Sequence, residues 1–251
     1  MNRYQLAWPP LTPGVKGLLI LYATIFLFYP LLGGTLGTRE FVISTLYLSN
    51  QGMFGELYLW QPVSYQLLHH DFFHLLFNCL VLYLFGAEVE RKWNLKAFLA
   101  FTFGCGLGAA AFGIMWYGAA RLISGQPGFD TTPIVGASGA ISGLVAAYCL
   151  YHWNHELRLM FAFRMKGKWL LPIFVGVDLL RLGLGSNIAV AHHFGGMLTG
   201  LAIVMVVYKP LQTISRLKIW RLKRKLRVLR GNSPPLNDPD DKGSGKNITY
   251  H

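Results

Sequence analysis

The sequence predicts an all-α protein that crosses a membrane six times, with a long outer segment after the first crossing. Only 14% of its 251 residues are charged, whereas soluble domains carry roughly 25%. The charges leave four gaps, each longer than the ~20 residues that a helix needs to span hydrocarbon. These gaps run between residues 16 and 39, 96 and 121, 130 and 156, and 181 and 209.

Six apolar helices are expected in order along the chain. Their ranges are about 16–36, 70–90, 95–117, 137–153, 168–182 and 188–208. The second and fifth are less regular, because Asp71 and Glu88 bound the second apolar run and Asp178 interrupts the fifth. The outer segment, residues 37–67, carries aromatic residues such as Trp60, which favour the interface between membrane and water.

The positive charges predict the orientation of these helices. If the N-terminus is cytoplasmic, 20 of the 23 Lys and Arg residues lie on the inner side. Only Arg39, Arg121 and Arg181 then lie outside. The positive-inside rule therefore predicts that both termini are cytoplasmic. Because topology explains the net charge of +12, no nucleic-acid partner is expected.

The start lacks the pattern of a cleavable signal peptide, so the first helix would serve as the insertion signal.

We expect three parts in the chain: a short cytoplasmic leader (1–14), a six-helix membrane domain (15–210), and a basic amphipathic segment with a disordered tail (211–251). Residues 209–230 hold nine basic and no acidic residues, interleaved with apolar ones. This composition predicts contact with anionic lipid. The alternative is a charged cytoplasmic helix that only fixes topology. The three cysteines fall in predicted helices and are expected to be small core residues.

Ser138 is the first candidate functional residue. It opens an apolar run and is surrounded by Gly136, Gly139 and Gly143. A hydroxyl in hydrocarbon needs a partner, and polar groups inside membranes are functional candidates by default. The alternative is ordinary helix packing, with the hydroxyl bonded to its own backbone.

A histidine in the sixth helix is the expected partner of Ser138. Glycines four apart let helix backbones approach closely, and each of the two helices has such a pair. The pairs are Gly139/Gly143 and Gly196/Gly200. His193 lies three residues before Gly196, on the same helical face. Close packing of the two glycine faces would bring the imidazole beside the Ser138 hydroxyl, and this predicts nucleophilic catalysis.

His74 and Asn78 form the second candidate group. They are four residues apart in the second helix and share a face. Both can donate hydrogen bonds, as the oxyanion of an attacked carbonyl requires. The alternatives are a polar pair that bonds between helices, or metal binding by His70 and His74. A metal would need a third ligand, and no residue has a clear spacing for one, so we expect no metal and no cofactor.

Three motifs in this order resemble those of the rhomboid intramembrane serine proteases of the six-helix bacterial type, over about residues 15–208. They are His-x4-His-x3-Asn at 69–78, Gly-x-Ser-Gly at 136–139 and His-x-x-Gly-x-x-x-Gly at 193–200. The resemblance implies a Ser–His dyad without a third acid, in which Ser138 attacks and His193 is the base. His192 competes for the second role, but only His193 satisfies the motif.

The resemblance also implies where the oxyanion binds and what the protein does. The donors would be the backbone N–H groups of Ser138 and Ala137 and the side chains of His74 and Asn78. The implied activity is cleavage of peptide bonds in or near transmembrane segments of substrate proteins. The implied location is the inner membrane of a bacterium, with the active site open to the periplasmic side. The fifth helix would be the gate for substrate.

Two positions depart from the family pattern. Gln61 follows Trp60 where the family often has arginine, which puts a contact of the outer segment in doubt. Ser142 stands where many members place an aromatic ring that stacks on the catalytic histidine, and its hydroxyl could bond the imidazole instead.

The alternative function is an inactive rhomboid-like protein that binds other transmembrane helices. A small transporter would want polar groups near the midplane, whereas those here gather toward one side.

Overall fold

The computed structural model describes residues 10–34, 39–125, 133–159, 163–183, 188–208, 219, 220 and 222. It divides into two compact units, with the boundary between Val206 and Val207, and each unit is considered by itself. Most of the predicted leader and nearly all of the predicted basic segment and tail lie outside the described residues. The three-part division of the chain stays a prediction.

Helices fall in all six of the ranges expected from the sequence. The α-helices are α1 (Pro13–Gly34), α2 (Arg39–Leu46), α3 (Gln61–Ser64), α4 (Phe72–Val81), α5 (Ala87–Lys92), α6 (Leu95–Ser124), α8 (Ser138–Tyr151), α9 (Leu170–Gly183) and α10 (Ile188–Ile203). Shorter helical turns are η1 (Gln51–Gly55), η2 (Tyr65–Leu67), η3 (Leu82–Gly86), η4 (Gly167–Trp169) and η5 (Val204–Tyr208). The turn η3 joins α4 to α5, so the second predicted helix is one continuous segment with a π-helical turn inside it.

Two of these segments are long and apolar enough to cross a membrane by length and composition. They are Phe72–Lys92 and Leu95–Ile123. Pro13–Tyr29, Ser138–Tyr151 and Val190–Val206 are shorter apolar helices. A helical membrane protein is therefore supported, while the number of six crossings stays a prediction.

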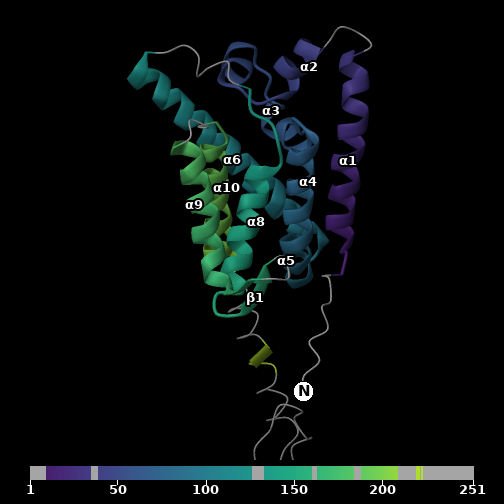
Figure 1. Cartoon of the computed structure of the whole chain (residues 1–251), viewed down its shortest axis with the longest axis vertical. Helices are drawn as coiled ribbons and strands as arrows, with labels where there is room; N and C mark the ends of the chain where they lie inside the picture. The colour runs from purple at the N-terminus through teal and green to yellow at the C-terminus, as the bar shows by residue number, and fades with distance from the viewer. Residues whose placement is uncertain are drawn as a thin grey trace, which may run out of the picture. The chain divides into compact units, whose positions relative to one another are not determined.

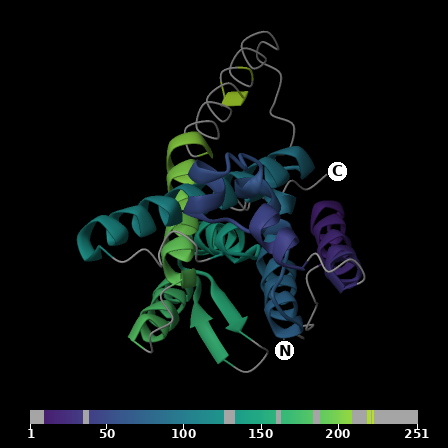
Figure 2. The ribbon, with the colours of Figure 1, turned by 90° about the horizontal axis from the view of Figure 1, so that it is seen from above.

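The helix α8 lies at the centre of the bundle. Figures 1 and 2 show it among α4, α6, α9 and α10, and it contacts all four. Nearly every residue of α8 between Gly139 and Cys149 is buried. Small residues make up much of this stretch, and a helix that is apolar on all sides is typical of a fully enclosed position. Any side chain at the start of α8 is therefore held by a crowded interior.

A buried carboxylate attaches α1 to the rest of the bundle. Glu90, in α5, accepts hydrogen bonds from the backbone N–H groups of Gly14 and Val15, at 2.8 and 3.0 Å. It also accepts one from the Thr12 hydroxyl. The first N–H groups of a helix lack partners within the helix. Glu90 therefore supplies the N-terminal cap of α1 from a distant part of the sequence.

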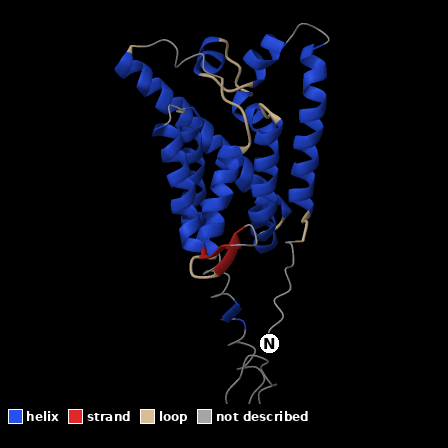
Figure 3. Cartoon of the chain, in the orientation of Figure 1, coloured by secondary structure: helices blue, strands red, loops and turns tan. Residues whose placement is uncertain are grey.

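Two features differ from the sequence prediction. The helix α6 continues to Ser124, beyond the expected end at residue 117, and stops where Gly125 adopts a φ of 67°. A glycine in this left-handed conformation is a common helix terminator. Between the fourth and fifth predicted helices, where no regular element was expected, the chain forms a short antiparallel strand pair of β1 (Glu156–Leu159) and β2 (Phe163–Lys166). Figure 3 shows it as the one strand pair in the described part of the chain.

Candidate active site

The segment before Ser138 is held in place by backbone hydrogen bonds. Ile134 and Leu48 exchange two of them, at 2.8 and 2.9 Å, and the N–H of Gly136 donates to the carbonyl of Tyr65 at 2.9 Å. Gly136 has a φ of +122°, which side chains of L-residues rarely allow. The outer segment thus fixes the chain as it enters α8.

Ser138 is the first residue of α8 and is half-buried. The carbonyl of Ala137, which is fully buried, accepts the N–H of Ile141 at 2.9 Å. The N–H groups at the start of a helix point outward along its axis without acceptors inside the helix. Such a terminus attracts negative charge. Ser138 therefore carries its hydroxyl beside backbone donors that suit an oxyanion.

The ring of His74 lies against the glycine that precedes Ser138. A Cβ atom on Gly136 would lie 2.6 Å from both Cε1 and Nε2 of His74. Asp71 caps α4 by accepting the N–H of His74 at 2.8 Å. The N–H of His70 donates to Nδ1 of His74 at 3.5 Å, which assigns the ring proton to Nε2. The donor nitrogen is thus the one that faces Gly136.

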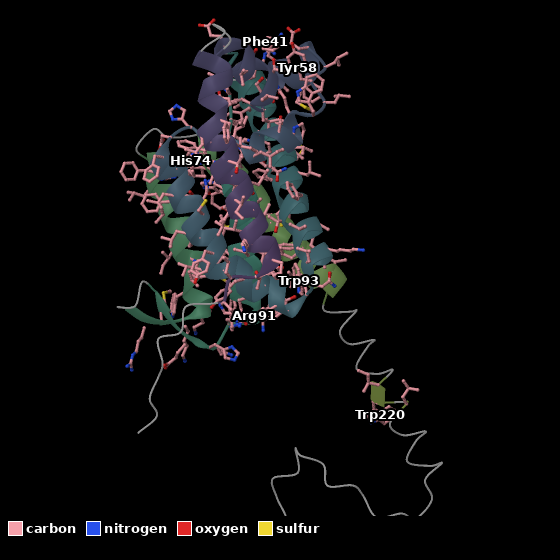
Figure 4. All side chains as sticks on the ribbon, turned by 90° about the vertical axis from the view of Figure 1, so that its right-hand side faces the viewer. Phe41, Tyr58, His74, Arg91, Trp93 and Trp220 are labelled. Carbon is pink, nitrogen blue, oxygen red and sulfur yellow. The ribbon has the colours of Figure 1, made fainter. Side chains whose placement is uncertain are left out.

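Asn78 lies one turn further along α4 and is buried. Its Nδ2 atom has no hydrogen-bond partner among the described residues. Buried polar atoms are normally paired, so an exception calls for an explanation. A donor kept dry and unused is what an oxyanion site requires. Figure 4 shows His74 toward the end of the bundle that carries Phe41 and Tyr58, away from Arg91 and Trp93.

The helices α8 and α10 touch through their glycines. A Cβ on Gly196 would lie 1.9 Å from the carbonyl oxygen of Gly139, and one on Gly200 would lie 2.6 Å from that of Gly143. No real side chain tolerates such distances, so these positions admit only glycine. The backbone contact fixes how α10, with its histidines, lies against the helix that Ser138 begins.

The two adjacent histidines of α10 face different neighbours. His193 Nδ1 lies 2.8 Å from Oδ1 of Asp178 in α9. His192 packs between the rings of Tyr65 and Tyr117, with centroids 6.2 and 6.1 Å away. A Cβ on Gly113 of α6 would lie only 2.0 Å from the ring of His192. His192 is thus a packed interior ring, and the contact with a carboxylate belongs to His193.

The two residues that depart from the family pattern make hydrogen bonds of their own. Ser142 donates its hydroxyl proton to the carbonyl of Ser138 at 2.8 Å, so this proton is not directed at an imidazole. Gln61 is buried; its Nε2 donates to the carbonyl of Ser44 at 2.7 Å and its Oε1 accepts the N–H of Ser49 at 3.1 Å. The glutamine therefore ties parts of the outer segment together.

One residue beside the predicted site, Asp178, was not predicted as part of it. Asp178 was treated only as an interruption of an apolar run, although a lone acid in such a run is itself a functional signal. His69 is buried and sits edge-on to His74, with ring centroids 5.2 Å apart; His70 is exposed. In the described part of the chain, no three His, Cys, Asp or Glu residues are grouped so as to hold a metal ion.

The described fold is a bundle of apolar helices, the architecture of helical integral-membrane proteins, with a serine at the start of its central helix. Residues 56–210, more than half of the chain, match the family model described as the Rhomboid domain. The chain belongs to the rhomboid family.

Several relatives in this family carry the name protease. Rhomboid protease AarA of Providencia stuartii is 31% identical over 156 residues, or 59% of this chain and 54% of the relative. RHOMBOID-like protein 12, mitochondrial, of Arabidopsis thaliana is 29% identical over 189 residues, or 72% and 54%. Putative rhomboid protease YdcA of Bacillus subtilis is 31% identical over 149 residues, or 57% and 65%. The chain thus spans about half the length of the first two and just under two thirds of the third.

Proposed function

We propose that this chain is an intramembrane serine endopeptidase that cleaves peptide bonds in or near the transmembrane segments of other proteins. One observation carries the proposal: α4 and α10 both pack against the start of α8. The backbone of α8 presents Ser138, α4 presents the ring of His74 against Gly136, and α10 is held against α8 by glycines. Nucleophile, donors and base are the parts that acyl transfer requires.

In the proposed reaction, the Ser138 oxygen attacks the carbonyl carbon of the scissile bond. Nε2 of His193 takes the hydroxyl proton as general base. The oxyanion then accepts hydrogen bonds from the N–H of Ser138, with that of Ala137 as a further donor, and from the side chains of His74 and Asn78. Removing one such donor typically lowers kcat by about 10²–10³.

The second half of the reaction restores the enzyme. The C–N bond breaks as His193 gives its proton to the leaving amine, which leaves an ester on Ser138. Water then attacks the carbonyl carbon of this ester while His193 takes a proton from the water. The bond to the Ser138 oxygen breaks, His193 returns the proton to that oxygen, and the carboxylic acid product leaves. Every step uses groups of this chain and water, so no cofactor is proposed.

The proposed partners are transmembrane substrates and membrane lipids, including anionic lipid at the basic segment. On the charge distribution, both termini are proposed to be cytoplasmic. The proposed membrane is the inner membrane of a bacterium, on the family resemblance. The position of His74 away from Arg91 and Trp93 supports a site that opens to the outer side.

The test is cleavage of a generic type I transmembrane substrate, in detergent and in liposomes, by wild type and by Ser138→Ala, His193→Ala and His192→Ala. We expect cleavage to be lost in the first two variants and kept in the third, once each variant is shown to be folded by its thermal unfolding. A fluorophosphonate that labels Ser138 covers the case of an unsuitable substrate. Wild-type protein that neither cleaves nor reacts with this reagent would refute the proposal and favour a helix-binding, inactive relative.

A further inference from the structure

The contact between Asp178 and His193 joins two helices inside the proposed site. Oδ1 of Asp178 in α9 lies 2.8 Å from Nδ1 of His193 in α10. The side chains are only 6% and 12% exposed, respectively. A hydrogen bond of this length between largely buried groups orients both of them.

The buried position of Asp178 is unfavourable in free energy for a carboxylate. Its neighbours Val177 and Leu179 in α9 are exposed apolar residues, in a helix of the kind that faces lipid. Burying a carboxylate costs several kcal/mol unless a charged or hydrogen-bonded partner compensates. In the described residues the hydrogen bond of Asp178 goes to His193. An acid at this position favours neither helix formation nor the packing of α9. We therefore look for its role in the contact with His193.

The geometry decides which ring nitrogen of His193 is available for catalysis. A carboxylate can only accept hydrogen bonds, so Nδ1 must carry the proton that it donates to Asp178. The lone pair of the neutral ring is then on Nε2. This is the nitrogen that must take the proton of Ser138 in the proposed reaction. The same carboxylate stabilises the positive charge that the ring gains in that step.

Other groups near α10 do not supply this orientation. Ser142 uses its hydroxyl proton on the carbonyl of Ser138. His192 packs on tyrosine rings and on α6. We therefore propose that Asp178 is a positioning residue that completes a Ser138–His193–Asp178 arrangement, in place of the dyad without a third acid that the resemblance implied. This inference rests on the proposed function.

Asp178 itself exchanges no proton in the proposed reaction. The proton moves from the Ser138 oxygen to Nε2 of His193 and from there to the leaving amine. Asp178 contributes by holding the His193 ring in place and by stabilising the positive charge that the ring carries for part of the reaction. The inference therefore predicts a loss of turnover rather than a loss of substrate binding.

The test compares Asp178→Asn and Asp178→Glu with wild type and with Val177→Ala, a control in the same helix. Asparagine keeps the shape and removes the charge, so we expect kcat to fall about 10²- to 10⁴-fold while KM changes less than about threefold. The rate of Ser138 labelling by a fluorophosphonate should fall in parallel. Glutamate, which restores the charge, should recover part of the loss, and Val177→Ala should behave as wild type.

A double variant separates positioning from a merely structural role. A residue that acts through His193 should have no further effect once that residue is gone. Asp178→Asn should therefore leave the residual labelling rate of His193→Ala unchanged. Wild-type kcat in Asp178→Asn, or a fall no larger than the loss of folded protein, would overturn the inference while Ser138→Ala remained inactive. Cleavage retained by Ser138→Ala would instead refute the proposed function itself.

Discussion

The helix α10 is held by two of its neighbours, α8 and α9, in opposite ways. Against α8 it packs backbone to backbone, so a single Cβ atom on Gly196 would clash with the backbone of Gly139. The bond from α9 is a polar one, between Asp178 and His193, and a Cβ on Gly176 of α9 would meet nothing within 4 Å. Packed backbones have one register, whereas a hydrogen bond can break without opening a cavity. The difference teaches that the glycine contact fixes α10 against the helix that Ser138 begins, whereas α9 orients a side chain of α10 through a hydrogen bond.

The largest effect is expected where the packed contact is broken. In Gly196→Ala the new Cβ would lie 1.9 Å from the Gly139 carbonyl oxygen, and backbone cannot yield as a flexible side chain can. We expect a loss of about 4 kcal/mol in the free energy of unfolding and no cleavage. Denaturant unfolding in detergent micelles measures the first effect.

Gly176→Ala is the matched control in α9. It adds the same carbon in open space, and alanine favours helix over glycine by roughly 0.5–1 kcal/mol. Stability should hold or rise and cleavage should persist. If both alanine variants proved equally stable and active, the contrast between the two neighbours of α10 would be wrong.

A second carboxylate that joins helices sharpens the contrast. Glu90 accepts three hydrogen bonds from the start of α1, all of them from groups that do not titrate. Glu90→Ala leaves buried N–H groups without partners, and should cost about 3 kcal/mol of unfolding free energy. Turnover per folded molecule should stay at the wild-type value, in contrast to Asp178→Asn.

Glu88→Gln is the control for Glu90. Glu88 pairs with Arg91 and Lys92 on a partly exposed face, where such pairs contribute roughly 0–1 kcal/mol. Its loss should be barely measurable in the same unfolding experiment. A fall in kcat for folded Glu90→Ala would contradict the contrast with Asp178. It would mean that the hydrogen-bond partners of a buried carboxylate do not show whether its role is structural or catalytic positioning.

The helices could be predicted from the sequence because their signals are local. Gaps between charges located α8 within two residues at its end and one at its start, and glycines four apart indicated which face of α10 would pack. The end of α6 was missed because residues 118–124 suit a helix, and only the conformation of Gly125 stops it.

The role of Asp178 could not be predicted in the same way. An acid in an apolar run signals that some partner exists, but the partner sits fifteen residues away, on the next helix. Which side of α9 meets α10 depends on the packing of the whole bundle. The cap on α1 is harder still, because Glu90 and Gly14 are 76 residues apart and neither shows a pattern that points to the other.

Apart from the control variants, the smallest expected effect concerns the ring contacts of His69. His69 packs edge-on between Tyr22 and His74, with centroids 5.2 Å from each. Burial, and then the nearby His74, lower the pKa of His69 from its ordinary 6.5 to about 3. The folded protein therefore keeps His69 neutral, while the unfolded chain takes up a proton below about pH 6.5. Its contribution to stability is complete above that pH and is lost progressively as the pH falls toward 3.

At pH 5 this loss should be on the order of 2 kcal/mol relative to pH 8. His69→Phe keeps a ring in the same place and removes the titration, so it should flatten the decline in unfolding free energy between these two pH values. His70→Phe, at an exposed position four residues before His74, is the control that should leave the decline as it is. A decline unchanged by His69→Phe would show that the pH sensitivity arises elsewhere. In that case the ring contact beside His74 is only packing, like the glycine contact between α8 and α10.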